Sequence, residues 1–100
     1  MAKKGMIERE KKRQNLVYKY KQVRQKLRSE MKFSNSFSDT LIISKNLQTL
    51  PLNSMSIRLR NRCFVTGKCR GFYRDFGLSR NMLRDMGSKC LIPGLVKSSW

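Results

Sequence analysis

Histidine is absent from the chain, and only six of its 100 residues are acidic. An enzyme needs an acid–base pair, an activated nucleophile or a metal ion at its site. The six carboxylates are scattered, and no glycine-rich phosphate loop precedes a predicted helix. These absences favour a binding or structural protein over an enzyme, and we expect no cofactor.

Disulfide bonds and membrane-spanning segments are not expected either. Three cysteines are an odd number in a short chain, which argues against a disulfide framework and fits a reducing compartment. No run approaches the roughly 20 apolar residues that a helix needs to cross a bilayer. The start of the chain lacks the apolar core of a secretory signal.

Positive charge is abundant. Lys and Arg together number 23 and give the chain a net charge of +17. Self-repulsion of this size opposes a compact free chain and favours a polyanionic partner. A nucleic acid is the first candidate, because many Lys and Arg side chains release counterions when they engage a regular array of phosphates. An anionic membrane is the second candidate.

Residues 1–32 are predicted to form a basic helical arm. They contain no proline, and apolar residues recur at steps of three and four, so that a helix carries one narrow apolar stripe. Lys and Arg surround this stripe and make a wide basic face that suits a phosphate backbone. A solvated surface helix and a helix lying on a membrane are the alternatives. The stripe consists of Leu16, Tyr20, Val23, Leu27 and Met31, and the candidate contacts are Lys11, Lys12, Arg13, Arg24 and Arg28.

Residues 33–57 form a connector with little charge, in which Lys45 is the one basic residue. Ser38 or Asp39 can cap a second helix, and Pro51 ends it. The apolar side chains of this helix provide either a small core or a surface that faces a neighbouring protein. They are Leu41, Ile42, Ile43, Leu47 and Leu50.

Residues 58–100 begin with Arg58, Arg60 and Arg62 at alternate positions. In an extended backbone this spacing puts all three guanidinium groups on one side, where each can donate two hydrogen bonds to phosphate oxygens. We expect residues 63–65 and 71–73 to form a short β-hairpin, joined by a turn that contains Gly67. The hairpin is expected to be stabilised by packing among Phe64, Phe72, Phe76 and Leu78.

A short third helix is predicted after this hairpin, with Ser79 as its N-cap and Gly87 at its end. Arg80 and Arg84 lie one turn apart on a common basic edge. An extended tail follows Pro93 and ends at Trp100. This residue is either a core plug or a group that stacks on bases or inserts into a protein groove. The predicted fold is therefore mostly α with little β: two helices, a small hairpin-plus-helix module and a tail.

The spacing of this module is that of a two-knuckle zinc site, but its ligands are degenerate. Positions 63 and 66 have CxxC spacing, and positions 79 and 82 repeat it. A structural zinc site requires four thiolate or imidazole ligands in a tetrahedron. One thiolate with two hydroxyls and a thioether does not make such a shell, so we expect no metal. The four residues are Cys63, Thr66, Ser79 and Met82.

Three runs in the second half of the chain form a specific pattern: Arg-Asn-Arg-Cys-x-x-Thr-Gly from Arg60, Arg-Gly-Phe-Tyr-Arg-x-Phe-Gly-Leu-Ser-Arg from Arg70, and Ile-Pro-Gly-Leu-Val-Lys-Ser-Ser-Trp from Ile92. In these runs the chain resembles the fourteenth small-subunit ribosomal protein. The resemblance extends to residues 47–54 and to the basic start, and so covers nearly the whole chain. That family has a short zinc-binding form and a longer zinc-free form, and this chain resembles the zinc-free form.

The resemblance implies a structural role in the head of the small ribosomal subunit. The implied partners are the 3′ major domain of small-subunit rRNA, near the decoding region, and the head proteins numbered three, ten and nineteen, with no membrane and no second copy of the chain. The sequence is most similar to plastid-encoded members, which implies a plastid ribosome; a mitochondrial or a bacterial origin is the alternative. The implied rRNA contacts are Arg58, Arg60, Arg62, Arg70, Arg74, Arg80, Arg84, Lys97 and Trp100.

Two departures from the family pattern weaken single contacts. Leu52 stands where the family usually has arginine, and Lys68-Cys69-Arg70 replaces the usual Arg-Pro-Arg. The turn thereby loses a rigid proline, and one fork-shaped donor becomes a point charge. Without the resemblance, the charge also fits a basic DNA-binding or architectural protein outside the ribosome, although no helix-turn-helix, zinc-finger or basic-zipper pattern is present.

Overall fold

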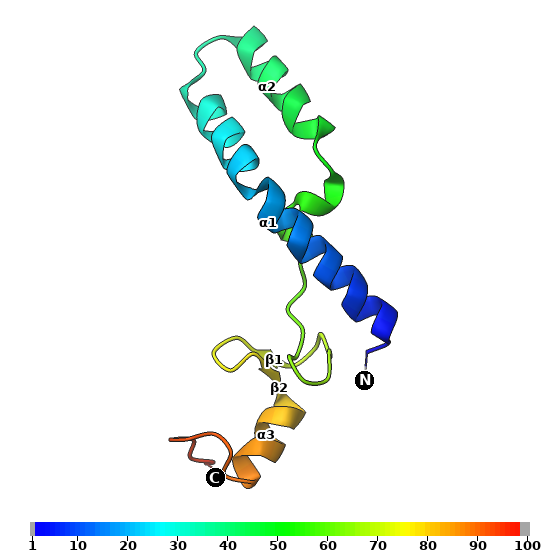
Figure 1. Cartoon of the computed structure of the whole chain (residues 1–100). Coiled ribbons are helices and arrows are strands. Elements are labelled where there is room, and N and C mark those ends of the chain that lie inside the picture. The colour runs from blue at the N-terminus through cyan, green and yellow to red at the C-terminus, as the bar shows by residue number, and fades with distance from the viewer. Residues whose placement is uncertain (1, 99–100) are drawn as a thin grey trace. The chain divides into compact units, whose positions relative to one another are not determined.

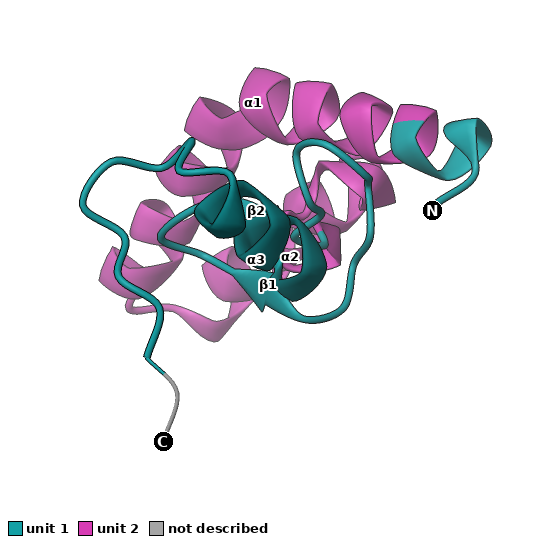
Figure 2. Ribbon diagram, turned by 90° about the horizontal axis from the view of Figure 1, so that it is seen from below, with its two compact units in different colours: residues 1–7, 60–100 teal, residues 8–59 magenta. Residues whose placement is uncertain are grey.

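The computed structural model describes residues 2–98 and is mostly helical, as predicted, with one small sheet (Figure 1). It divides into two compact units (Figure 2). Residues 8–59 form what we call the helical unit; residues 2–7 and 60–98 form the C-terminal unit. The first residues of the chain therefore belong to the unit that contains its last residues.

The helical unit consists of α1 (Lys4–Phe33), whose first turn lies in the C-terminal unit, α2 (Phe37–Thr49) and two 3-10 turns. α2 runs back alongside the second half of α1 after a three-residue loop (Figure 1). Its N-cap is Ser36, not Ser38 or Asp39 as predicted, because the carbonyl of Ser36 already accepts the N–H of Thr40. The helix ends before Pro51 as predicted, since the residue before a proline disfavours helical geometry.

The apolar stripe of α1 differs from the prediction at one position. Val23 is 45% exposed, whereas Arg24 is only 6% exposed. Arg24 lies four residues after Tyr20 and three before Leu27, so it continues the row of inward-facing positions, and Val23 is turned to one side of that row. The buried position is thus occupied by a charged side chain.

The C-terminal unit contains a hairpin of β1 (Phe72–Tyr73) and β2 (Leu78–Ser79), followed by α3 (Arg80–Ser88). The strands are antiparallel and pair Phe72 with Ser79 and Tyr73 with Leu78. The predicted pairing of residues 63–65 with 71–73 is wrong. Residues 64–66 form a tight turn instead, and Gly77 (φ +66°) supplies the left-handed residue that the hairpin turn needs.

We call residues 63–68 the knuckle. The N–H of Cys63 donates to the carbonyl of Lys68, and the N–H of Gly67 donates to the carbonyl of Cys63. Gly67 has a φ of +73°, and a Cβ at this position would lie 2.8 Å from Cδ1 of Ile7 and 3.3 Å from Cβ of Ala2. The start of the chain therefore packs directly against the knuckle.

The core of this unit is smaller than predicted. Within residues 2–98, Cys63 and Leu78 are the buried hydrophobic residues of the structure. Phe64 is 92% exposed and Phe76 is also exposed, so the expected cluster of four apolar side chains does not form. Phe64 lies in the turn of the knuckle, where its N–H donates to the carbonyl of Gly77 at 3.0 Å and its side chain is exposed to solvent.

Helix α3 begins as predicted: the hydroxyl of Ser79 accepts the N–H of Met82 at 3.5 Å. It does not end at Gly87 but continues to Ser88, and Cys90 takes the left-handed conformation after it (φ 54°). Gly87 has a packing role instead, because a Cβ there would lie 2.8 Å from Cδ2 of Leu95. The tail thus packs closely against the last turn of α3.

Candidate nucleic-acid interface

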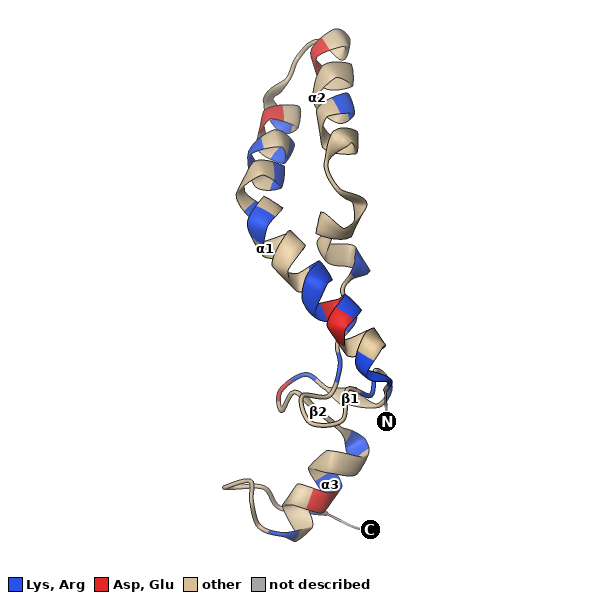
Figure 3. Cartoon of the chain, turned by 45° about the vertical axis from the view of Figure 1, so that its right-hand side comes forward, with Lys and Arg blue, Asp and Glu red and all other residues tan. Residues whose placement is uncertain are grey.

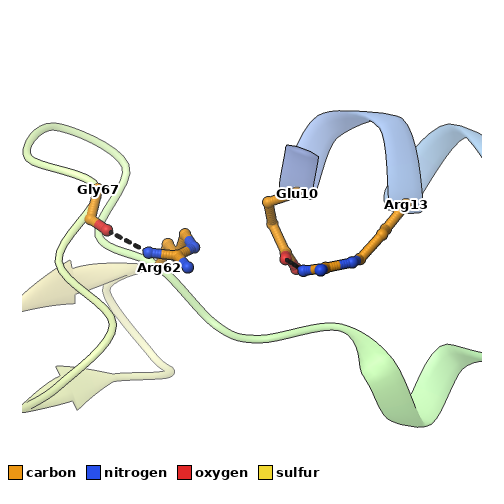
Figure 4. A network of polar contacts seen from close by, with 4 residues as sticks. All are labelled: Glu10, Arg13, Arg62 and Gly67. Carbon is orange, nitrogen blue, oxygen red and sulfur yellow. Dashed lines mark hydrogen bonds and ion pairs between the residues drawn. The ribbon is translucent and has the colours of Figure 1, made fainter. Parts of the chain in front are cut away.

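Basic residues are distributed along α1 and over the C-terminal unit, whereas α2 carries little charge (Figure 3). On α1, Lys11, Lys12 and Arg28 are exposed and Arg13 is partly buried. Lys11 forms an ion pair with Glu8 at 3.3 Å. Arg13 forms one with Glu10, also at 3.3 Å (Figure 4). The first pair is solvent-exposed and contributes little stability, so Lys11 can exchange this partner for a phosphate at small cost.

Arg24 is engaged inside the helical unit. Its Nε donates to Oγ of Ser54 at 2.9 Å, and its Nη2 donates to the same oxygen at 2.7 Å and to the carbonyl of Pro51 at 3.1 Å. Ser54 is 1% exposed. We call this set of contacts the Arg24–Ser54 clasp, and it holds the 3-10 turn at Leu52–Ser54 against α1. Sequence reasoning missed this role, although the position of Arg24 on the apolar row was a visible signal.

A groove of about 680 Å³ runs along α1 in the helical unit. Its walls include Tyr18, Lys21, Arg28 and Lys32. The helical rise separates Lys21 from Arg28 by about 10 Å and Arg28 from Lys32 by about 6 Å along the axis. Tyr18 is 82% exposed. Lys21 belongs to the basic face that was predicted for this helix. Lys32 and Tyr18 were not predicted, although their spacing from Arg28 places them on the same side of the helix.

Arg58, Arg60 and Arg62 do not form the continuous extended segment that was predicted. Arg58 ends a 3-10 turn (Ser56–Arg58) in the helical unit. In the C-terminal unit, Nη2 of Arg60 donates to the carbonyl of Cys69 at 3.4 Å, and Nη1 of Arg62 donates to the carbonyl of Gly67 at 3.1 Å (Figure 4). Arg60 and Arg62 therefore also hold the turn of residues 67–69 in place.

Two grooves collect most of the predicted contacts of the C-terminal unit. One, of about 380 Å³, is lined by Arg62, Lys68 and Arg70. The other, of about 770 Å³, is lined by Arg80, Arg84 and Lys97. Arg74 is exposed in the hairpin turn between β1 and β2. Trp100 lies outside the described residues. These assignments as rRNA contacts stay predictions.

The degenerate zinc positions do not fit a zinc ion. The hydroxyl of Ser79 is used as the cap of α3, Thr66 bonds to Cys63, and Met82 supplies only a thioether. No group of three or more His, Cys, Asp or Glu residues that could hold a metal occurs in residues 2–98. Of the four degenerate positions, only Cys63 carries a side chain that zinc sites use as a ligand.

The knuckle nevertheless keeps an environment for a thiolate. Burial by itself raises the pKa of Cys63, but the Thr66 hydroxyl and the backbone N–H groups of Thr66, Ser79 and Val65 donate toward its sulfur and lower the pKa to about 6. Hydrogen bonds from the protein thus stabilise the negative charge that a metal ion stabilises in a zinc knuckle.

We expect Cys63 of the full chain to titrate near pH 6, and the Thr66→Val variant to titrate at higher pH because it loses the hydroxyl donor. Because the folded pKa is the lower one, the thiolate stabilises the fold increasingly as the pH rises above about 6, and this contribution is lost as the pH falls through that value. Ultraviolet absorbance of the thiolate, with Cys63→Ser as the reference, measures the titration. An unchanged midpoint in Thr66→Val contradicts the role of the hydroxyl.

None of the helices within residues 2–98 has both the length and the apolar character needed to cross a membrane. A family model described as Ribosomal protein S14p/S29e matches residues 46–99. The chain is 73% identical to the small ribosomal subunit protein uS14c of Bigelowiella natans, over 100% of both chains. Over the same full coverage it is 58% identical to uS14c of Angiopteris evecta and 56% identical to uS14 of Acaryochloris marina.

These matches decide the class of protein. The relatives are ribosomal proteins and not enzymes, and the uS14c relatives are the plastid form, which supports a plastid ribosome as the location. The resemblance seen in the second half of the sequence is confirmed and extends over the full length. The chain belongs to the ribosomal protein S14 family and is a structural constituent of the small ribosomal subunit.

Proposed function

We propose that this protein binds small-subunit rRNA directly, in the 3′ major domain that forms the head of the subunit near the decoding region. The observation that supports the proposal most strongly is the grouping of cations around grooves in the C-terminal unit, with no Asp or Glu among the lining residues that the structure describes. A groove of this kind attracts phosphates, and each phosphate that is neutralised releases counterions.

The three segments of the chain have different parts in this function. Residues 1–32 act as a basic arm along rRNA backbones, and residues 58–100 bind rRNA through the cations that line the two grooves, through the hairpin turn and through α3. The connector, residues 33–57, carries almost no charge and exposes Phe37, Leu41 and Ile42 on α2. An apolar surface of this kind suits contact with protein, and we assign it to the neighbouring head proteins three, ten or nineteen.

Sedimentation of an organelle lysate on sucrose gradients at low and at high salt tests the proposal. We expect the chain to migrate with the small subunit at both salt concentrations. We also expect mild ribonuclease treatment at low salt to release the chain, because rRNA holds it in the subunit. Migration with DNA, or with membranes, would exclude the proposal. The neighbouring proteins are identified by cross-linking of intact subunits through Cys90, which is exposed.

A further inference from the structure

The groove beside α3 has features that a simple phosphate-binding surface does not need. It is lined by β1, by α3 and by the tail, all within the C-terminal unit, and its volume of about 770 Å³ is in the range of sites that enclose small ligands. Its walls present three cations, one amide and one aromatic ring: Arg80, Arg84, Lys97, Asn81 and Tyr73.

Contacts within the C-terminal unit position two of the three cations, Arg80 and Lys97. The N–H of Arg80 donates to the carbonyl of Gly71 at 2.7 Å, and a Cβ at Gly71 would lie 3.3 Å from Cγ and Cδ of Arg80. The absence of a side chain at Gly71 therefore leaves room for the Arg80 stem. Arg84 follows one turn later on α3, and Nζ of Lys97 donates to Oγ of Ser88 at 2.8 Å.

The charged ends of Arg80 and Arg84 are free to bind a ligand. Within residues 2–98, neither guanidinium group has a hydrogen bond or ion pair with the protein, and the same holds for the side-chain amide of Asn81. The carboxylate of α3, Asp85, forms an ion pair with Lys89 at 3.0 Å. Asp85 does not line the groove, and among residues 2–98 no other Asp or Glu side chain does, so none of these carboxylates neutralises the positive charge there.

The ring of Tyr73 gives the groove an apolar face. Tyr73 is 49% exposed, and Leu83 and Leu95 line the same groove. An exposed ring beside uncompensated arginines is the combination that binds single-stranded nucleic acid, because a base stacks on the ring while the guanidinium groups hold the flanking phosphates. A protein ligand would instead need acidic groups to match three cations.

We propose that this groove receives one unstacked nucleotide of rRNA, with its base on Tyr73 and its flanking phosphates on Arg80, Arg84 and Lys97. The amide of Asn81 can both donate to and accept from a base edge, so it adds a means of base selection. The proposal rests on the proposed rRNA-binding function and adds to it a stacking site for a base that is extruded from its helix.

The test is binding of the full chain to the 3′ major domain of small-subunit rRNA, measured over a series of salt concentrations. Tyr73→Leu removes the ring and keeps an apolar side chain, whereas Tyr73→Phe keeps the ring. We expect Tyr73→Leu to lose about 5- to 150-fold in affinity with an unchanged salt slope, and Tyr73→Phe to bind like the wild type. Phe64→Leu, which removes an exposed ring of the same unit outside the groove, is the matched control and should bind like the wild type.

Two further variants do not depend on the ring. Arg84→Ala should reduce the salt slope by about 0.7 to 1 unit, because it removes one phosphate contact. Gly87→Ala should displace the tail, since its Cβ would lie 2.8 Å from Leu95, and so weaken binding although alanine favours the helix.

The outcomes separate the two proposals. If the wild-type chain does not bind this rRNA, the proposed function fails. If it binds and Tyr73→Leu loses no more affinity than Phe64→Leu, the stacking site is overturned and the rRNA-binding function stands. If Tyr73→Leu and Tyr73→Phe lose the same affinity for rRNA, stacking on the ring is also overturned. Protection of one unpaired base from chemical modification by the wild type, and not by Tyr73→Leu, supports it.

Discussion

Replacing Arg58, Arg60 and Arg62 together with alanine is expected to flatten the salt dependence of rRNA binding by about two to three units. The slope of log affinity against log salt counts the phosphates that a protein neutralises, and each arginine is assigned to one of them. The affinity should also fall for a second reason: Arg60 and Arg62 donate to the carbonyls of Cys69 and Gly67, so their removal loosens the turn of residues 67–69. The measurement is the affinity of the full chain for the 3′ major domain at several salt concentrations.

A triple lysine variant separates charge from shape. Lysine keeps the positive charges, so the salt slope should return to the wild-type value, but it cannot reproduce the planar fork of arginine at two acceptors. Lys45→Ala, on the nearly uncharged α2, should leave the slope unchanged and serves as the control. A wild-type slope in the triple alanine variant would exclude these three residues as phosphate contacts.

Replacing Ser54 with alanine is expected to open the turn between α2 and the C-terminal unit. The substitution removes the acceptor of two hydrogen bonds from Arg24, whose side chain keeps its hydrogen bond to the carbonyl of Pro51. Arg24 is only 6% exposed, so water cannot readily replace the lost acceptor. Leaving a buried polar group unsatisfied costs about 1–3 kcal/mol. Amide exchange at Ser54 and Met55, whose N–H groups close the turn onto Pro51 and Leu52, should become about 5- to 150-fold faster in assembled subunits.

A double-mutant cycle shows whether this cost arises from the clasp. In an Arg24→Met background the buried charge is gone, and Ser54→Ala should cost less than it does in the wild type. Ser29→Ala removes an exposed hydroxyl that bonds to the backbone of α1 and should leave exchange in the turn unchanged. Equal effects of Ser54→Ala in both backgrounds would mean that Arg24 and Ser54 are not coupled.

The local features of the fold could be predicted from the sequence, because they depend on neighbouring residues. The long first helix, the stop before Pro51 and the cap at Ser79 are of this kind. The hairpin register was not predictable in the same way, because two glycines, Gly67 and Gly77, could each supply a turn and only one closes the sheet.

The candidate site was predicted as a set of residues but not as an arrangement. The excess of Lys and Arg and the family resemblance indicate which side chains face rRNA. That Arg80 and Arg84 share a groove with Tyr73 and Lys97 depends on how β1, α3 and the tail pack, which periodicity does not report. Arg24 is a second example. A basic residue on a basic helix is predicted to contact phosphate, and only the position of Ser54 in the fold shows that the guanidinium group of Arg24 binds within the protein.

The packing of Ala2 and Ile7 against Gly67 affects the order in which the chain can fold. The first residues leave the ribosome tunnel early, but the surface that receives them is complete only after the knuckle has been synthesised. Closing a loop of this length costs chain entropy before any contact compensates for it, and contacts between distant residues slow folding. We expect the N-terminal segment to dock late, so that during synthesis the basic start of the chain stays available to RNA before the C-terminal unit has formed.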